Sequence, residues 1–111
     1  IAATHVDKMV AFYNNVFNCE LNETTVHGQS LFCGKLGETK LLICPNEIAQ
    51  VKAEQNRHQL EFLVTDIEKT LETTRSFGGK IKEEIKNSAT EKVASITDPD
   101  GNTMVLKQHL M

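Results

Sequence analysis

Two residues of opposite charge, Glu61 and Lys107, are the first candidates for chemistry in this sequence. Glu61 lies in the run 59–64, where the two-residue period of a strand places Gln59, Glu61 and Leu63 on one face and an all-apolar set on the other. A carboxylate held in apolar surroundings can serve as a general base. The simpler interpretation is a partly solvated ion pair between Glu61 and Lys107 that contributes little. Both interpretations remain open at this point.

The composition is that of an ordinary globular domain with a small acidic surplus. The 111 residues carry a formal charge of −3, and 40% of them are hydrophobic. This length suits one compact domain or two small repeated units that share a core. The lack of a basic surplus argues against nucleic acid as a partner, and no apolar run is long enough for a membrane span. Because the three cysteines lack metal-finger spacing, we expect reduced thiols in a cytoplasmic protein.

The elements that would position these residues form an internal repeat. Residues 4–10 can be laid over residues 65–71, an offset of 61 (65 − 4). Both stretches start with Thr followed three residues later by an acid, a helix-start signature, and Thr65 with Glu68 fits a capping box. Apolar residues then recur at helical spacing. The first stripe is Val6, Met9, Val10, Tyr13 and Phe17. The second is Ile67, Leu71 and Phe77, and Gly78 with Gly79 is expected to end that helix.

The last strands of the two halves also repeat. Gly-x-Thr, a variable residue and two apolar residues occur at 37–42 and at 101–106, an offset of 64 (101 − 37) that matches Leu41 with Val105. Strand-like runs at 20–27 and 30–36 have counterparts at 80–86 and 91–97. We predict an α+β fold of two βαβββ units, residues 1–45 and 58–111, with a polar and briefly helical connector at 46–57. The strand before the first helix is truncated in this prediction, and the alternative is an unduplicated α+β domain with two similar helices.

Four motifs in this order give the chain a family resemblance. They are Phe12-Tyr13 in the first helix, Val64-Thr65-Asp66 at the second helix, Gly78-Gly79 after it, and the turn 98–102, DPDGN. The chain resembles the vicinal oxygen chelate superfamily, which includes glyoxalase I, bleomycin-resistance proteins and extradiol dioxygenases. The resemblance implies a curved mixed sheet around a cavity with the helices packed outside, and it often implies a homodimer.

In the metal-dependent members of this family, His, Gln or Glu side chains from four strands hold a divalent ion. The resemblance places a Glu ligand in the last strand, three residues after Asn102, where this chain has Val105. An isopropyl group has no lone pair to donate, and Lys107 would lie on the same face. The matched position in the first unit is the apolar Leu41, and only Gln59 stands at a ligand position. We therefore expect no metal.

The resemblance then implies a small-molecule binding protein that needs no metal. We expect its ligand to contact Gln59, Glu61, Leu63, Val105, Lys107 and Leu41, with Glu61 as the one candidate catalytic residue. The chain has no Trp and 5% aromatic residues, which favours a small aliphatic or mixed-polarity ligand over a large planar one. The alternative is a lyase, isomerase or dioxygenase that holds Zn, Ni, Mn or Fe through Glu61, Gln59 or residues before Ile1. A third possibility is a fold kept for association only.

Overall fold

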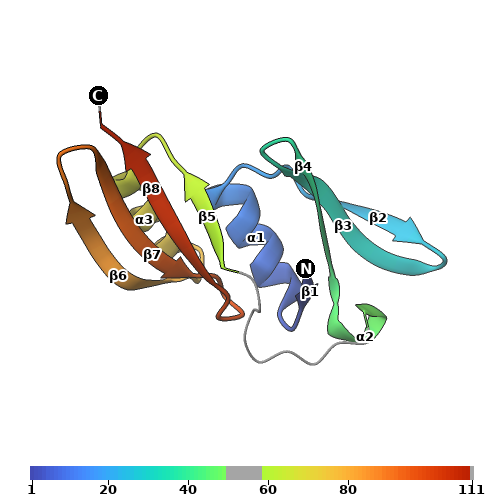
Figure 1. Ribbon diagram of the computed structural model, residues 1–111. Coiled ribbons are helices and arrows are strands. Elements are labelled where there is room, and N and C mark those ends of the chain that lie inside the picture. Colours follow the sequence, from blue (N-terminus) through green and yellow to red (C-terminus); the bar gives the residue numbers. More distant parts are fainter. Residues whose placement is uncertain (50–58, 111) are drawn as a thin grey trace. The chain divides into compact units, whose positions relative to one another are not determined.

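The computed structural model describes residues 1–49 and 59–110. The chain divides into two compact units, Ile1–Ala53 and Glu54–Met111, and each contains one four-stranded sheet (Figure 1). The strand and helix order within each unit confirms the predicted α+β fold of two βαβββ units. In the part of the chain that the structure describes, no helix is both long and apolar enough to cross a membrane.

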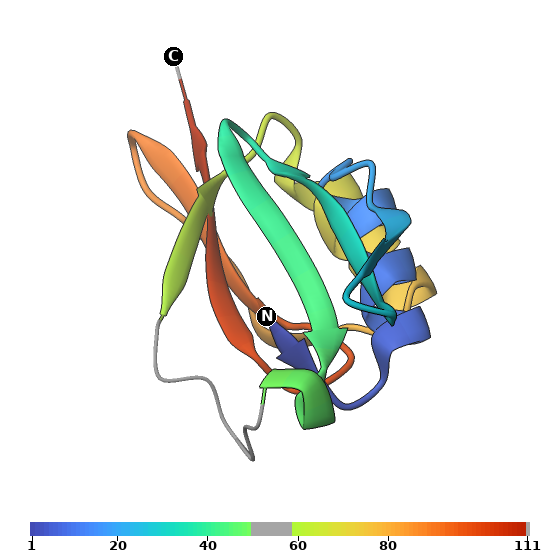
Figure 2. The ribbon, with the colours of Figure 1, turned by 90° about the vertical axis from the view of Figure 1, so that its right-hand side faces the viewer.

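The first unit starts with a very short strand. β1 (Ala2–Ala3) precedes α1 (Val6–Val16), and β2 (Asn22–Val26), β3 (Gln29–Leu36) and β4 (Thr39–Pro45) follow. The strand order is β1-β4-β3-β2, with β1 parallel to β4 and the other pairs antiparallel. β1 lies beside the end of β4, next to the short helix α2 (Asn46–Ala49) (Figures 1 and 2). The truncated first strand is therefore present, and α2 opens the segment predicted as connector; residues 50–57 of that segment lie outside the described residues.

The second unit repeats this arrangement with a longer first strand. β5 (Leu60–Leu63) leads to α3 (Ile67–Ser76), which is followed by β6 (Lys80–Asn87), β7 (Glu91–Thr97) and β8 (Thr103–His109). The order is β5-β8-β7-β6, with β5 parallel to β8. β8 is therefore a central strand, and its side chains alternate between the two faces of the sheet.

The helices bury apolar stripes that the sequence predicts in part. α1 buries Met9 and Tyr13 as predicted, and it also buries Phe12, whose ring packs edge-on against Tyr13. α3 buries Ile67 and Leu71, but the prediction for Phe77 is wrong, because this residue is the C-cap and is 37% exposed. Thr74 takes the buried position instead, and its hydroxyl donates to the Thr70 carbonyl at 2.8 Å. That hydrogen bond satisfies the hydroxyl within the helix and so permits its complete burial.

The predicted threonine cap of the second helix is also wrong. Asp66, not Thr65, is the N-cap of α3, and its Oδ1 accepts a hydrogen bond from the Lys69 amide at 3.1 Å. Asp is at least as good an N-cap as Thr, so the helix begins one residue later than the capping box suggested. In α1 the N-cap is His5, without a side-chain cap. Gly78 does end α3 as predicted, with φ +89° and a hydrogen bond from the Gly79 amide to the Thr74 carbonyl.

Strand pairing gives the repeat a different register from the one read in the sequence. Ala2 pairs with Cys44 and Leu63 pairs with Lys107, and each first-strand residue lies four positions before its helix. Cys44 therefore corresponds to Lys107, an offset of 63 (107 − 44), and Leu42 corresponds to Val105. The match of Leu41 with Val105 is off by one residue. Gly37 and Gly101 lie in corresponding turns, but the β3–β4 turn has two residues and the β7–β8 turn has five. An alignment on these glycines therefore does not give the strand register.

Candidate functional site

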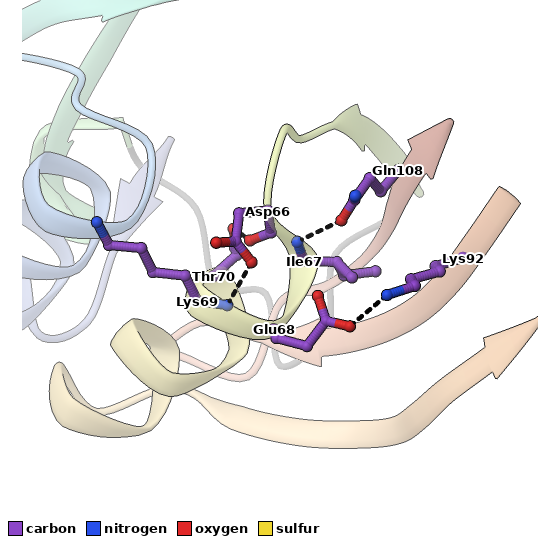
Figure 3. A network of polar contacts seen from close by, with 7 residues as sticks. All are labelled: Asp66, Ile67, Glu68, Lys69, Thr70, Lys92 and Gln108. Atoms are coloured by element: carbon purple, nitrogen blue, oxygen red, sulfur yellow. Dashed lines mark hydrogen bonds and ion pairs between the residues drawn. The ribbon is translucent and has the colours of Figure 1, made fainter. Parts of the chain in front are cut away.

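Two contacts identify the face of the second sheet that packs against α3. The Gln108 side chain of β8 accepts a hydrogen bond from the Ile67 amide at 2.8 Å, and Lys92 of β7 pairs with Glu68 at 2.5 Å (Figure 3). Gln108 and Lys92 are directly opposite each other in the strand register. Alternation therefore places the even-numbered residues of β7 and β8 against the helix, and among them Ala94, Ile96, Met104 and Leu106 are buried.

The odd-numbered residues form the other face, which holds the predicted charged pair. In β5, Glu61 is the register partner of Val105 and Leu63 is the partner of Lys107, so these side chains share one side of the sheet. We call this side the ion-pair face; β5, β7, β8 and the residue before β5 contribute Gln59, Glu61, Leu63, Glu91, Val93, Ser95, Thr97, Thr103, Val105, Lys107 and His109 to it. The structure thus brings five of the six predicted ligand-contacting residues together in one unit.

The pairing predicted between Glu61 and Lys107 is confirmed. Lys107 Nζ lies 2.6 Å from Glu61 Oε1, and the side chains are 31% and 50% exposed, respectively. The hydrogen bond that Lys107 donates to Glu61, together with the charges of Glu61 and Glu91, raises the pKa of Lys107. The ammonium therefore stays protonated over the physiological range. A half-exposed carboxylate in contact with an ammonium is not the apolar environment that the general-base hypothesis requires.

Polar groups that the sequence analysis did not single out surround this pair. Thr103 donates a hydrogen bond to Gln59 Oε1 at 2.7 Å. Ser95 is buried, and its hydroxyl lies 3.4 Å from a carboxylate oxygen of Glu83 on β6. Ser95 is directly opposite Val105 in the register, so a hydroxyl and an isopropyl group lie side by side in the middle of the face. The alternation of side chains along residues 91–97 could have placed Ser95 on this face from the sequence alone.

Leu41 belongs to a different environment in the first unit. It pairs directly with Gly34, and a Cβ on Gly34 would lie 2.3 Å from the Cys19 carbonyl oxygen. The face that Leu41 shares with Gly34 and Ile43 therefore packs on the segment that follows α1. Leu41 is 8% exposed and Ile43 is fully buried, as core residues are. A one-residue change of register moves a side chain to the opposite face, so Leu42 occupies the counterpart position of Val105.

The donor set on the ion-pair face does not fit a divalent metal ion. Within residues 1–49 and 59–110, no three His, Cys, Asp or Glu side chains form a group that could hold one. Gln59 Oε1 already accepts from Thr103, and Glu61 already contacts an ammonium. Val105 offers no donor atom at the position where the resemblance places a carboxylate. Lewis-acid chemistry on this face would need ligands that these residues do not supply.

The sequence model of the glyoxalase/bleomycin resistance protein/dioxygenase superfamily matches residues 1–106 of this chain. The chain therefore belongs to this superfamily, as its motifs indicated. No match was found among curated proteins.

Several solved structures share the fold at low sequence identity. A hypothetical protein from S. aureus has a TM-score of 0.78 at 16% identity, over 97% of this chain and 88% of that one. A glyoxalase/bleomycin resistance protein/dioxygenase family enzyme from Burkholderia phytofirmans has a TM-score of 0.77 at 17% identity, over 99% and 94%. The fosfomycin resistance protein FosX from Listeria monocytogenes has a TM-score of 0.74 at 14% identity, over 100% and 89%. At these sequence identities, the similarities show a shared fold and nothing about function.

Proposed function

We propose that this chain is a small-molecule binding protein that holds its ligand on the ion-pair face without a metal ion. The observation that carries the proposal is the contact between Glu61 and Lys107 beside Val105. A metal-dependent relative would need a carboxylate at position 105, and this chain instead offers an isopropyl group beside a fixed pair of charges. Leu63 and Val105 supply apolar surface, while Gln59, Thr103 and Ser95 supply hydrogen-bonding groups, a combination typical of ligand sites.

Family membership supports the class of partner, and the proposal has two further parts, the oligomeric state and the location. Homodimerisation is an expectation from the family, and gel filtration tests it. A cytoplasmic location agrees with Cys19, Cys33 and Cys44 as free thiols. The fosfomycin resistance protein FosX shares this fold, which agrees with a small-molecule partner for the fold.

The test is a fragment titration followed by NMR on the full chain. Small aliphatic and mixed-polarity compounds are added to ¹⁵N-labelled protein, with and without EDTA. We expect amide shifts at Glu61, Val105 and Lys107 that EDTA does not change. The double variant Glu61→Gln/Lys107→Met should alter the binding, whereas Glu68→Gln/Lys92→Met removes an ion pair on the helix-facing side and should not.

Two results would argue against the proposal. If fragments shift only residues on the helix-facing side, the site is elsewhere. If the purified protein contains stoichiometric Ni, Zn, Mn or Fe and EDTA abolishes binding, the metal-dependent lyase, isomerase or dioxygenase alternative gains the support. Metal analysis by mass spectrometry should precede the titration for this reason.

A further inference from the structure

The charges over the middle of the second sheet are paired with each other. Glu61 contacts Lys107 at 2.6 Å, and on the far strand β6 Lys86 lies 3.6 Å from Glu83. Glu83 is the register partner of Ser95, and Lys86 is the partner of Val93, so both belong to the same side as the first pair. Each pair joins one carboxylate to one ammonium, and Glu91, at the start of β7 on the same side, adds a further carboxylate whose charge acts on Lys107.

The surface between the two pairs is small, uncharged and free of aromatic rings. The two central strands contribute Val105 from β8 and Val93 and Ser95 from β7. Three strand spacings separate β5 from β6, which is about 14 Å at about 4.8 Å per spacing. A ligand that lies across the central strands therefore meets aliphatic carbon and one hydroxyl, with a pair of opposite charges at each edge.

A ligand with one net charge would be poorly matched to this arrangement. An anion attracted to Lys107 also approaches the carboxylates of Glu61, which contacts this ammonium, and of Glu91, whose charge acts on it. A cation attracted to Glu61 approaches the Lys107 ammonium in the same way. In either case the ligand meets a like charge or takes one side chain from its partner, and both are unfavourable. An uncharged molecule leaves both pairs intact.

We infer that the ion-pair face selects uncharged, non-aromatic small molecules, with the Glu61–Lys107 contact as the specificity determinant that rejects singly charged ones. This inference depends on the proposed function, since it names the ligand class of the same site. It also predicts that removing one partner converts the site. The variant Glu61→Gln leaves the Lys107 ammonium without the carboxylate that contacts it and should accept anions, whereas Lys107→Met leaves Glu61 without its ammonium and should accept amines.

Three compounds with one carbon skeleton test this inference. Isovaleramide is neutral, isovalerate is an anion and isopentylamine is a cation at neutral pH. Each is titrated by NMR into wild type, E61Q, K107M, the double variant E61Q/K107M, and the helix-side controls E68Q and K92M. Because Glu61 and Lys107 are partly exposed, these variants should keep the fold, which the dispersion of the amide spectrum checks.

Wild type should bind isovaleramide about threefold more tightly than either charged compound. E61Q should gain about threefold for isovalerate, and K107M should gain about the same for isopentylamine. The double variant and both controls should show neither gain. The inference is overturned if wild type binds a charged compound at least as tightly as the amide, or if the single variants keep the wild-type ranking. If no compound shifts this face in any variant, the proposed function itself fails, and the inference fails with it.

Discussion

Gln108 of β8 accepts a hydrogen bond from the Ile67 amide of α3 at 2.8 Å, across the sheet from the contact that its neighbour Lys107 makes with Glu61. The first amides of a helix have no partner within the helix, so Gln108 satisfies a donor that would otherwise need water. One strand therefore anchors the helix on one side, as Figure 3 shows for Gln108, and carries Lys107 of the candidate site on the other.

Replacing Gln108 by Leu should destabilise the second unit. The Ile67 amide is partly buried and would lose its acceptor, at a cost of about 1 kcal/mol in the free energy of unfolding. Gln108→Glu keeps an acceptor and places a negative charge at the helix N-terminus, so it should recover most of the loss. Urea unfolding of the three proteins measures both effects. Equal stability of the Leu and Gln proteins would mean that water replaces the side chain without cost.

Replacing Asp66 by Ala should cost about 1 kcal/mol, whereas replacing Thr65 by Ala should change stability by much less. Asp66 Oδ1 accepts from the Lys69 amide at 3.1 Å, which makes Asp66 the cap. Urea midpoints and the far-ultraviolet helix signal compare the two variants. A larger loss in Thr65→Ala would restore the capping box that the sequence suggested.

Replacing Gly34 by Ala should force β3 away from the segment after α1. The new Cβ would lie 2.3 Å from the Cys19 carbonyl oxygen, and the Lys35 amide donates to that same oxygen at 2.8 Å. Steric overlap of this kind typically costs roughly 1–3 kcal/mol. Hydrogen exchange at the Lys35 amide should accelerate. In Gly37→Ala, where no heavy atom lies within 4 Å of the new Cβ, the exchange of Lys35 should stay slow, although the positive φ carries its own strain.

Stability should fall at alkaline pH because of Cys19. Burial raises the pKa of this thiol from 9.0 to about 11. Below pH 9 the thiol is neutral in both states and has no effect, but between pH 9 and pH 11 the unfolded chain ionises first, and this favours unfolding. The stability of wild type relative to Cys19→Ala should therefore be constant below pH 9 and decrease toward pH 11. A constant difference across the whole range would contradict this assignment.

The sequence predicted the fold because its signals were local and repeated. Gly78, the DPDGN turn and the alternation of β8 each specify backbone geometry within a few residues, and their order identified the two βαβββ units. The contact of Glu61 with Lys107 followed from alternation together with the family strand order. The positions of residues that depend on the register between neighbouring strands were harder to predict. Ser95 and Thr103 become part of the face only through their partners, and Leu41 was placed one residue away from the correct match because turn length is not visible in the Gly-x-Thr motif.

Along β8, residues of the buried core alternate with residues of the proposed ligand face. Met104 and Leu106 are almost fully buried against the helix side, while Val105 and Lys107 are only partly covered on the other. Under the proposed function, a point mutation at 105 or 107 alters ligand binding with little effect on the core, and one at 104 or 106 does the reverse. A lineage built on this strand can acquire new ligands by single substitutions while it inherits the same core.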